Sequence, residues 1–276
     1  MTTSPSHSDD ASYADDLALA LRLADEADAI SHARYRAADL DVSLKADHTH
    51  VTDADRAVER RIRDLLARER PDDAFFGEET GRTSIEGMPH RQWIVDPIDG
   101  TANFLRGVPV WATLVSLVVD SQPVVGVVSA PALGRRWWAR AGGGAFVAEQ
   151  SEGGAAVPRL LRVSAVSTLD AASLSYNGLQ YWIKADRVPQ LLALASQVWR
   201  TRAYGDFWSY MLVAEGAIDI SGEFDLQPYD MAALDVIVRE AGGRFGGIDG
   251  GDGIWHGSAL ATNGLLHEAT LTALAK

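Results

Sequence analysis

The chain has 276 residues, of which 47% are hydrophobic; it contains no cysteine and carries a formal net charge of −13. The absence of cysteine excludes disulfides, thiolate metal sites and cysteine nucleophiles, and it favours a cytoplasmic protein. The negative charge argues against nucleic-acid binding, and no apolar run of about 18 residues predicts a membrane span.

The N-terminal segment is acidic and rich in serine, and it lacks the basic and apolar blocks of a signal peptide. We therefore expect residues 1–12 to be a disordered leader. Apolar residues at helical spacing predict a helix over 15–36 and a second one over 53–69. The second helix has Thr52 as a candidate N-cap, and Pro71 follows its end.

The centre of the chain has strand-like patterns instead. Strands are predicted at 92–96, 112–120, 123–130 and 135–142. The second and third of these are close enough for a hairpin turn. Trp137 and Trp138, adjacent in the fourth, are expected to face opposite sides of the sheet.

The second half of the chain mixes strands and helices. Strands are predicted at 159–164, 173–177, 217–222 and 259–263, and helices at 187–198, 206–215 and 230–241. A loop at 151–156 suggests an N-terminal half, 13–150, and a C-terminal half, 151–276. Neighbouring strands are expected to be antiparallel, so the fold class is α+β with layered sheets and helices.

Acidic residues gather at the ends of several predicted elements, and each has an ordinary explanation. Asp53 suits the first turn of a helix, and Asp230 suits a helix N-cap. Glu78 and Glu79 suit a solvated turn. These readings stay open for each residue taken alone.

The stretch "DPIDGT" (96–101) is harder to explain in this way. Pro97 is expected to turn the chain, so that Asp96 and Asp99 point to the same side. Gly100 permits a close backbone approach, and a helix starting at Thr101 would offer N–H groups to an anion. Carboxylates beside an anion site predict cations between them, and oxygen ligands favour Mg²⁺ or Mn²⁺.

Three segments, "GEET" (77–80), "DPIDGTANF" (96–104) and "YDMAA" (229–233), resemble in order and spacing the signatures of the inositol monophosphatase superfamily of Mg²⁺-dependent phosphatases. "KADHTHVTDAD" (45–55) also resembles a segment of that family. The resemblance runs from about residue 15 to the C-terminus. It implies an α/β/α/β/α sandwich of the inositol monophosphatase and fructose-1,6-bisphosphatase type, usually as a homodimer.

The resemblance also implies a set of metal ligands. One ion would be held by Glu78, Asp96 and the carbonyl of Ile98, and a second by Asp96, Asp99 and Asp230. A third, weaker ion would lie near Glu78. The expected cofactor is therefore Mg²⁺ as two or three ions, with Mn²⁺ as a possible substitute.

Further roles follow from the same resemblance. Gly100 and Thr101 would offer backbone N–H groups to the phosphate. Thr101 and Asp53 would orient and deprotonate the attacking water, and Glu78 counts as catalytic as well as a ligand.

A closer resemblance concerns the substrate. "HRQWIVDPIDGT" (90–101), "RGVPVWATL" (106–114), "VSAPALGRRWWAR" (128–140) and "RAYGDF" (202–207) are similar to the histidinol-phosphate phosphatases of this superfamily, which act in histidine biosynthesis. The activity implied is hydrolysis of L-histidinol phosphate to L-histidinol and phosphate. The alternatives are an inositol-1-phosphate phosphatase or a broad sugar phosphatase. A non-catalytic metal-binding protein is disfavoured because every expected ligand is present.

The segment from Arg202 onward lies where family members contact the leaving alcohol, and Glu223 corresponds to the family's substrate-binding acid. Asp206 and Glu223 together could bind an ammonium group, which histidinol phosphate has and inositol lacks. Two ordinary readings stay open: Asp206 could be a helix N-cap, and Asn177 could belong to a turn and not to the substrate pocket.

Overall fold

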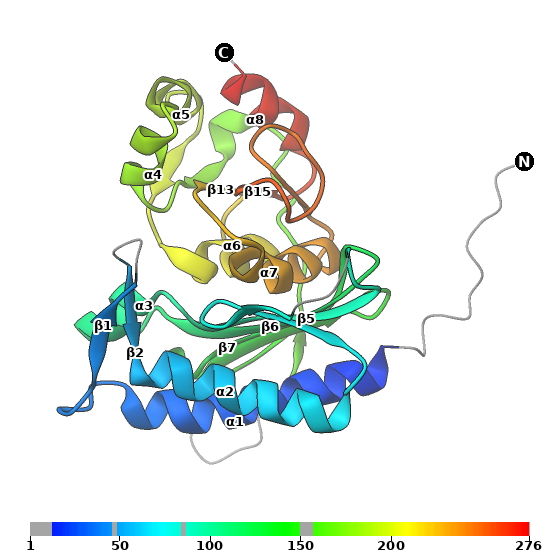
Figure 1. Cartoon of the computed structure of the whole chain (residues 1–276). Coiled ribbons are helices and arrows are strands. Elements are labelled where there is room, and N and C mark those ends of the chain that lie inside the picture. Colours follow the sequence, from blue (N-terminus) through cyan, green and yellow to red (C-terminus); the bar gives the residue numbers. More distant parts are fainter. Residues whose placement is uncertain (1–12, 46–48, 84–86, 150–156, 276) are drawn as a thin grey trace, which may run out of the picture.

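The computed structural model describes residues 13–45, 49–83, 87–149 and 157–275. They form alternating layers of helices and sheets in the order α/β/α/β/α (Figure 1). This confirms the layered α+β sandwich. The expected leader, residues 1–12, lies outside the described residues. No helix in the described ranges is long and apolar enough to cross a membrane.

The larger sheet has eight strands in the order β10-β9-β8-β7-β6-β5-β3-β4. Their bounds are β3 Ala74–Gly77, β4 Gly81–Arg82, β5 Arg91–Asp99, β6 Ala112–Val119, β7 Gln122–Ala130, β8 Arg135–Arg140, β9 Gly144–Glu149 and β10 Arg159–Leu160. All neighbours are antiparallel except β3 and β5, which are parallel. The predicted hairpin between β6 and β7 is present.

The smaller sheet has five strands in the order β12-β11-β13-β15-β14. Their bounds are β11 Ser173–Ser175, β12 Arg200–Arg202, β13 Ile220–Phe224, β14 Arg244–Gly246 and β15 Ser258–Thr262. Strand β11 runs parallel to both β12 and β13. The expectation of antiparallel neighbours is therefore wrong here and at β3–β5. In the smaller sheet the parallel strands are joined by helical crossover segments, as parallel pairing requires. A separate hairpin consists of β1 Val42–Leu44 and β2 His50–Thr52.

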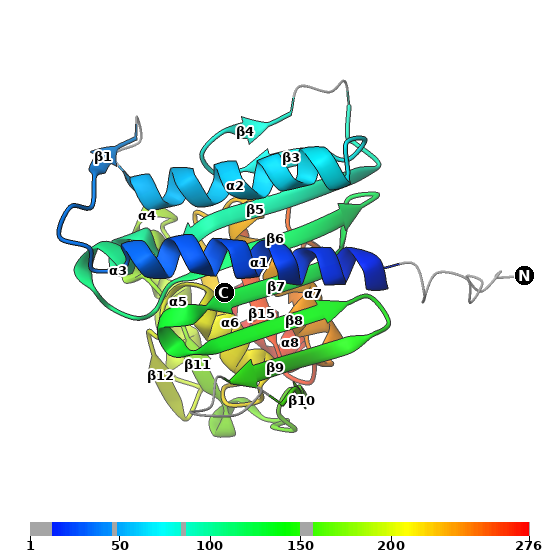
Figure 2. The same ribbon diagram turned by 90° about the horizontal axis from the view of Figure 1, so that it is seen from below.

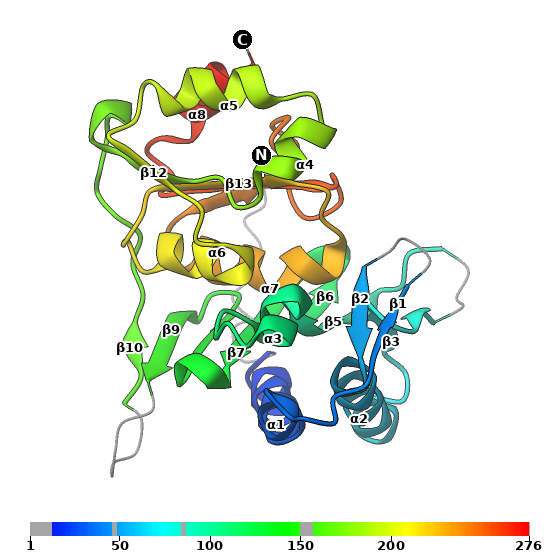
Figure 3. The same ribbon diagram turned by 90° about the vertical axis from the view of Figure 1, so that its left-hand side faces the viewer.

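Helices cover the sheets on three levels. Two long helices, α1 Ala14–Arg34 and α2 Asp53–Glu69, lie side by side across the outer face of the larger sheet (Figure 2). The middle layer contains α6 Asp206–Ala214 and α7 Pro228–Glu240. The outer layer contains α4 Leu179–Lys184, α5 Val188–Ala195 and α8 His267–Leu274 (Figure 3). Short segments complete the set: α3 Thr101–Arg106 and the 3₁₀ turns Pro131–Leu133 and Leu169–Ala171.

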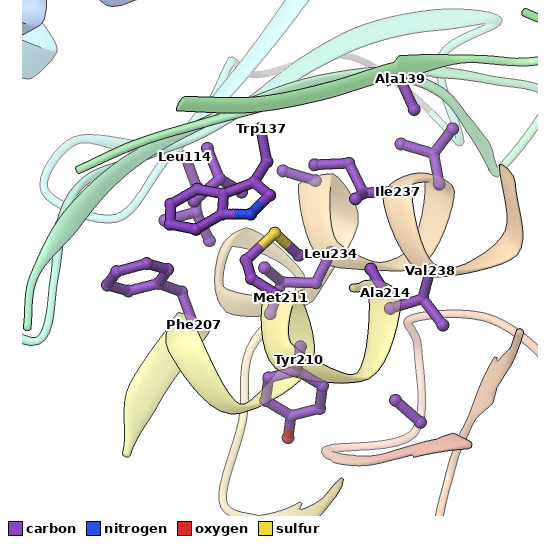
Figure 4. Close-up of a cluster of buried hydrophobic side chains, with 14 of the residues drawn as sticks. Leu114, Trp137, Ala139, Phe207, Tyr210, Met211, Ala214, Leu234, Ile237 and Val238 are labelled. Atoms are coloured by element: carbon purple, nitrogen blue, oxygen red, sulfur yellow. The ribbon is translucent and has the colours of Figure 1, made fainter. Parts of the chain in front are cut away.

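Because helices cover both faces of the larger sheet, its central strands β5, β6 and β7 are buried along most of their length and are mostly apolar. In β6, Val115 and Leu117 pack toward α1 and α2, whereas Leu114 packs toward the middle helices. Trp137 is fully buried against the middle helices (Figure 4), and Trp138 packs on the opposite side. The adjacent tryptophans therefore face opposite sides, as the alternation of a strand requires.

The largest core cluster joins the two halves of the chain. It contains Leu114 and Trp137 from the larger sheet together with Met211 and Leu234 from the middle helices (Figure 4). The division at residue 150 stays a prediction, and the proposed loop at 151–156 lies outside the described residues.

Candidate metal centre and active site

The end of β5 carries two acidic side chains that a regular strand would place on opposite faces, because they are three residues apart. The pairing of β5 with β6 shifts register between Asp96 and Asp99, and this irregularity brings both to the same side. A carboxylate oxygen of Asp230, in the first turn of α7, lies within 4.8 Å of one oxygen from each of them. The three residues form a group that can hold a cation.

Asp230 reaches this group because of how α7 begins. Its side chain accepts a hydrogen bond from the backbone N–H of Gln227 at 2.7 Å, which closes a capping box with Gln227 as the N-cap. Asp230 is therefore the third residue of the helix and not the N-cap that its sequence context allowed.

A second acidic group lies beside the first. Oxygen atoms of Asp55, Glu78 and Glu79 lie within 4.8 Å of one another. Lys45 approaches both glutamates at 2.7 Å. After burial, Glu78 is the neighbouring charge that most raises the pKa of Asp96, so the two groups interact electrostatically.

Burial and mutual repulsion both disfavour negative charge in this region. Burial first, and then the neighbouring carboxylates, raise the pKa of Asp96 and of Asp99 well above the ordinary value. The same causes raise the pKa of Asp230 to about 7 and that of Glu79 to about 7. Burial alone would lower the pKa of the Lys45 ammonium group. The charges and hydrogen bonds of Glu78 and Glu79 have a larger effect, so the pKa of Lys45 is raised. A bound cation would relieve this repulsion.

Gly100 and Thr101, the two residues that were expected to bind the phosphate, directly follow β5. Gly100 has a φ of 82° and is the N-cap of α3, and an added Cβ would lie 2.9 Å from the carbonyl oxygen of Val110. Only glycine fits there without strain. The hydroxyl of Thr101 is 3.0 Å from the carbonyl oxygen of Ile98 and 3.3 Å from Oδ1 of Asp55.

The acidic partner of Thr101 is Asp55 and not Asp53. The carboxylate of Asp53 instead pairs with Arg34 at 2.7 Å. Residues two positions apart lie about 200° apart around a helix, so only one of them can face the site. The structure therefore corrects the sequence analysis: Asp55 has the position that was expected for Asp53.

A further pair of carboxylates lies on the side where α6 begins. Asp206 accepts a hydrogen bond from Asn103 Nδ2 at 2.6 Å, and Glu223 accepts one from the amide of Asn177. Burial raises the pKa of Asp206 to about 6 and that of Glu223 to about 8. The backbone N–H of Phe207 donates to Asp99 at 2.8 Å, which connects this pair to the metal group.

Neither the capping role considered for Asp206 nor the substrate contact expected of Arg202 agrees with the structure. The N-cap of α6 is Gly205, and the side chain of Asp206 makes no capping bond, so the reading of Asp206 as a cap is wrong. Arg202 is exposed on β12 and its guanidinium donates to the carbonyl of Thr201. The structure does not bring it to either carboxylate.

The chain matches the model of the inositol monophosphatase family over residues 13–276. It belongs to this family. A histidinol-phosphatase from Mycobacterium tuberculosis is 55% identical to it, with 94% of this chain and 98% of that protein covered. A histidinol-phosphatase from Streptomyces coelicolor is 51% identical, with 94% and 96% covered. The solved structure of an inositol monophosphatase from Zymomonas mobilis has a TM-score of 0.82 and 32% identity, with 96% and 99% covered.

Membership of the inositol monophosphatase family makes the chain a metal-dependent phosphoric monoester hydrolase, and the residues present fit that role. Both acidic groups offer only carboxylate oxygens, which are the donors that hard divalent cations prefer. Burial and the neighbouring carboxylates raise the pKa of Asp96 and Asp99, and a bound cation would offset both effects. Lys45 supplies one positive charge, and only to the second group.

Sequence reasoning missed four residues that the structure places in the site: Lys45, Asp55, Glu79 and Asn103. Asp55 had a detectable signal, because Thr52 and Asp55 have the spacing of a capping box, which the structure contains. The others depend on contacts between segments far apart in the chain, such as Asn103 with Asp206.

Proposed function

We propose that the chain hydrolyses L-histidinol phosphate to L-histidinol and inorganic phosphate, with two or three Mg²⁺ ions as the cofactor. The observation that carries the substrate choice is the pair Asp206 and Glu223, two largely buried carboxylates beside the metal group. Histidinol phosphate has an ammonium group and an imidazole that they can bind, whereas inositol 1-phosphate has only hydroxyls. The two histidinol-phosphatases at 55% and 51% identity support the same choice.

The proposed metal ligands are Glu78, Asp96, the carbonyl of Ile98, Asp99 and Asp230. Oxygen donors of this type suit Mg²⁺, and Mn²⁺ could replace it. When bound, divalent cations neutralise charge on the phosphoryl oxygens and make a water molecule more acidic.

The other residues bind and orient the reactants. The N–H groups of Gly100 and Thr101, at the start of α3, would donate to the phosphate. Thr101 donates to Asp55, so its hydroxyl can accept from the attacking water and align it with the phosphorus, and Asp55 can take up the proton. Asn103 and Asn177 hold Asp206 and Glu223 in place.

A panel of phosphate esters tests the proposal. Phosphate release from L-histidinol phosphate, inositol 1-phosphate and glycerol 2-phosphate is compared with Mg²⁺ and with chelator. We expect the highest kcat/KM for L-histidinol phosphate and no activity in chelator. A clear preference for inositol 1-phosphate would favour the alternative, an inositol-1-phosphate phosphatase. No release from any ester with Mg²⁺ would favour a non-catalytic protein.

We also propose a cytoplasmic homodimer. The family resemblance supports the dimer, and the composition without cysteine supports the location. Light scattering of the purified chain tests the oligomeric state: a mass of two chains is expected, and a mass of one chain would contradict it.

A further inference from the structure

Glu59 lies one helical turn after Asp55 in α2, and it is 1% exposed. Its two carboxylate oxygens accept hydrogen bonds from the backbone N–H groups of Glu79 at 2.7 Å and Thr80 at 2.8 Å. We propose that Glu59 is a positioning residue that fixes the turn after β3 against α2, so that Asp55, Glu78 and Glu79 face a divalent cation together. The inference rests on the proposed metal-dependent function.

The backbone N–H groups of the turn show how it is held. The N–H of Glu78 donates to the carbonyl oxygen of Val95 at 3.2 Å, which ties the turn to β5 just before Asp96. The next two N–H groups both donate to Glu59. The turn is therefore connected to the strand that ends in Asp96 and to the helix that carries Asp55.

Side-chain packing does not hold the outer side of this turn. That side borders a groove of about 330 Å³, and the described residues that line it are all charged or polar. Hydrogen bonds to a charged acceptor are about twice as strong as neutral ones. The two bonds to Glu59 therefore connect the turn to α2 through a charged acceptor.

The acidic group needs such a connection because its members repel one another. Oxygens of Asp55, Glu78 and Glu79 lie within 4.8 Å, and the ammonium of Lys45 offsets only part of the repulsion between them. A turn free to move would relax away from α2, and the ligands would have to be gathered again when a cation binds.

Gly77 provides independent support for the importance of this contact. A Cβ at Gly77 would lie 2.4 Å from the carboxyl carbon of Glu59, and the backbone there is outside the left-handed region. The space occupied by Glu59, and not backbone strain, therefore requires glycine. In Gly77→Ala, the added methyl group should push the carboxylate of Glu59 out of its position against the turn.

The test measures Mn²⁺ binding to the full chain by electron paramagnetic resonance, without substrate. In Glu59→Gln the amide group keeps its size, but its NH₂ faces a backbone N–H, so one of the two bonds is lost. We expect Mn²⁺ affinity to fall by about tenfold or more, as for other residues that orient metal ligands. Gly77→Ala should cause a similar loss. Glu69→Gln makes the same substitution at the exposed far end of α2, where Glu69 pairs with Arg22, and should bind Mn²⁺ like the parent.

Activity provides a second readout. In Glu59→Gln, the Mg²⁺ concentration that gives half-maximal rate should rise, and most of the lost activity should return at saturating Mg²⁺. Thermal unfolding in chelator shows whether each variant is folded. Unchanged Mn²⁺ affinity in folded Glu59→Gln and Gly77→Ala would overturn the inference. Failure of both to fold would also overturn it, because Glu59 would then serve overall stability. Binding is measured without ester, so a wrong substrate would not affect this result.

Discussion

Thr101 donates its hydroxyl to Oδ1 of Asp55 across 3.3 Å, which joins the first residue of α3 to the first turn of α2. Asp55 is itself held by the backbone N–H of Thr52 at 2.8 Å. The helix cap and the proposed water-orienting pair therefore share one carboxylate.

This relationship predicts different outcomes for two neighbouring aspartates. Asp55→Asn removes the proposed proton acceptor and should lower kcat by about 10²–10⁴-fold. Asp53→Asn breaks only the half-exposed pair with Arg34 and should leave kcat nearly unchanged. Steady-state rates at saturating Mg²⁺ check this, with thermal unfolding to show that both variants fold. A larger loss of kcat in Asp53→Asn than in Asp55→Asn would instead support Asp53 as the residue that orients and deprotonates the attacking water.

Replacement of Asp230 by asparagine is expected to weaken metal binding while α7 stays folded. Asparagine can still accept from the N–H of Gln227, so Asp230→Asn should keep the cap of α7. It removes one of three clustered charges and should weaken Mg²⁺ binding at least about tenfold, measured by calorimetry. Asp225→Asn, which affects only an exposed pair with Lys184, is the control. Equal affinities in the two variants would exclude Asp230 as a ligand.

The raised pKa values predict how pH affects the stability of the metal-free protein. The pKa is about 7 for Asp230 and for Glu79, and about 8 for Glu223, each above its unfolded value. The folded state therefore holds more protons than the unfolded state, and the stability present at low pH is lost as pH rises through these values. In chelator, the unfolding temperature should fall by several degrees between about pH 5 and pH 8. Saturating Mg²⁺ should reduce this fall in unfolding temperature, because the cation neutralises the carboxylates. An equal fall with and without Mg²⁺ would show that these carboxylates do not bind the cation.

The acidic pair predicts a selective effect on substrate binding. Glu223→Gln and Asp206→Asn should each raise KM for L-histidinol phosphate by about tenfold to a hundredfold, which corresponds to a charged hydrogen bond worth about 1.5–3 kcal/mol. The KM for a neutral-alcohol ester such as glycerol 2-phosphate should change much less. Equal increases for both esters would show that the carboxylates do not recognise the ammonium group.

The close approach of α7 to the larger sheet predicts a stability effect. A Cβ at Gly126 in β7 would lie 2.6 Å from the carbonyl oxygen of Ala233 and 2.5 Å from a methyl group of Val236. Gly126→Ala should therefore lower the free energy of unfolding by about 1–3 kcal/mol. Gly222 has its nearest neighbour at 3.6 Å and is the control for Gly→Ala in a strand. Denaturant unfolding measures both, and equal stabilities would show that the sheet accommodates the methyl group.

Elements with a strong local signal could be predicted from the sequence. The helix α2 has the predicted bounds and N-cap, because Thr52 and the apolar spacing specify it locally. The short strands β1, β3 and β4 could not be found, since two to four residues carry too little periodicity. Their positions depend on pairing with distant segments.

The sequence indicated most of the acidic residues of the site, but it did not indicate how their segments bring them together. Asp96 and Asp99 do share a side, but β5 continues through Pro97 with a shift of register, and the chain does not turn there as predicted. The capping-box spacing could mark Asp55 as part of a helix cap, but not its contact with Thr101. That contact and the one between Glu59 and Glu79 join segments 20 or more residues apart. Local sequence cannot specify which side of α2 faces the turn after β3.

The most direct test of the account is anomalous diffraction from crystals of the chain grown with Mn²⁺. The account predicts Mn²⁺ peaks ligated by Asp96, Asp99 and Asp230 and by Glu78, with Thr101 and Asp55 beside them. An active enzyme whose Mn²⁺ peaks lie away from these carboxylates would contradict it.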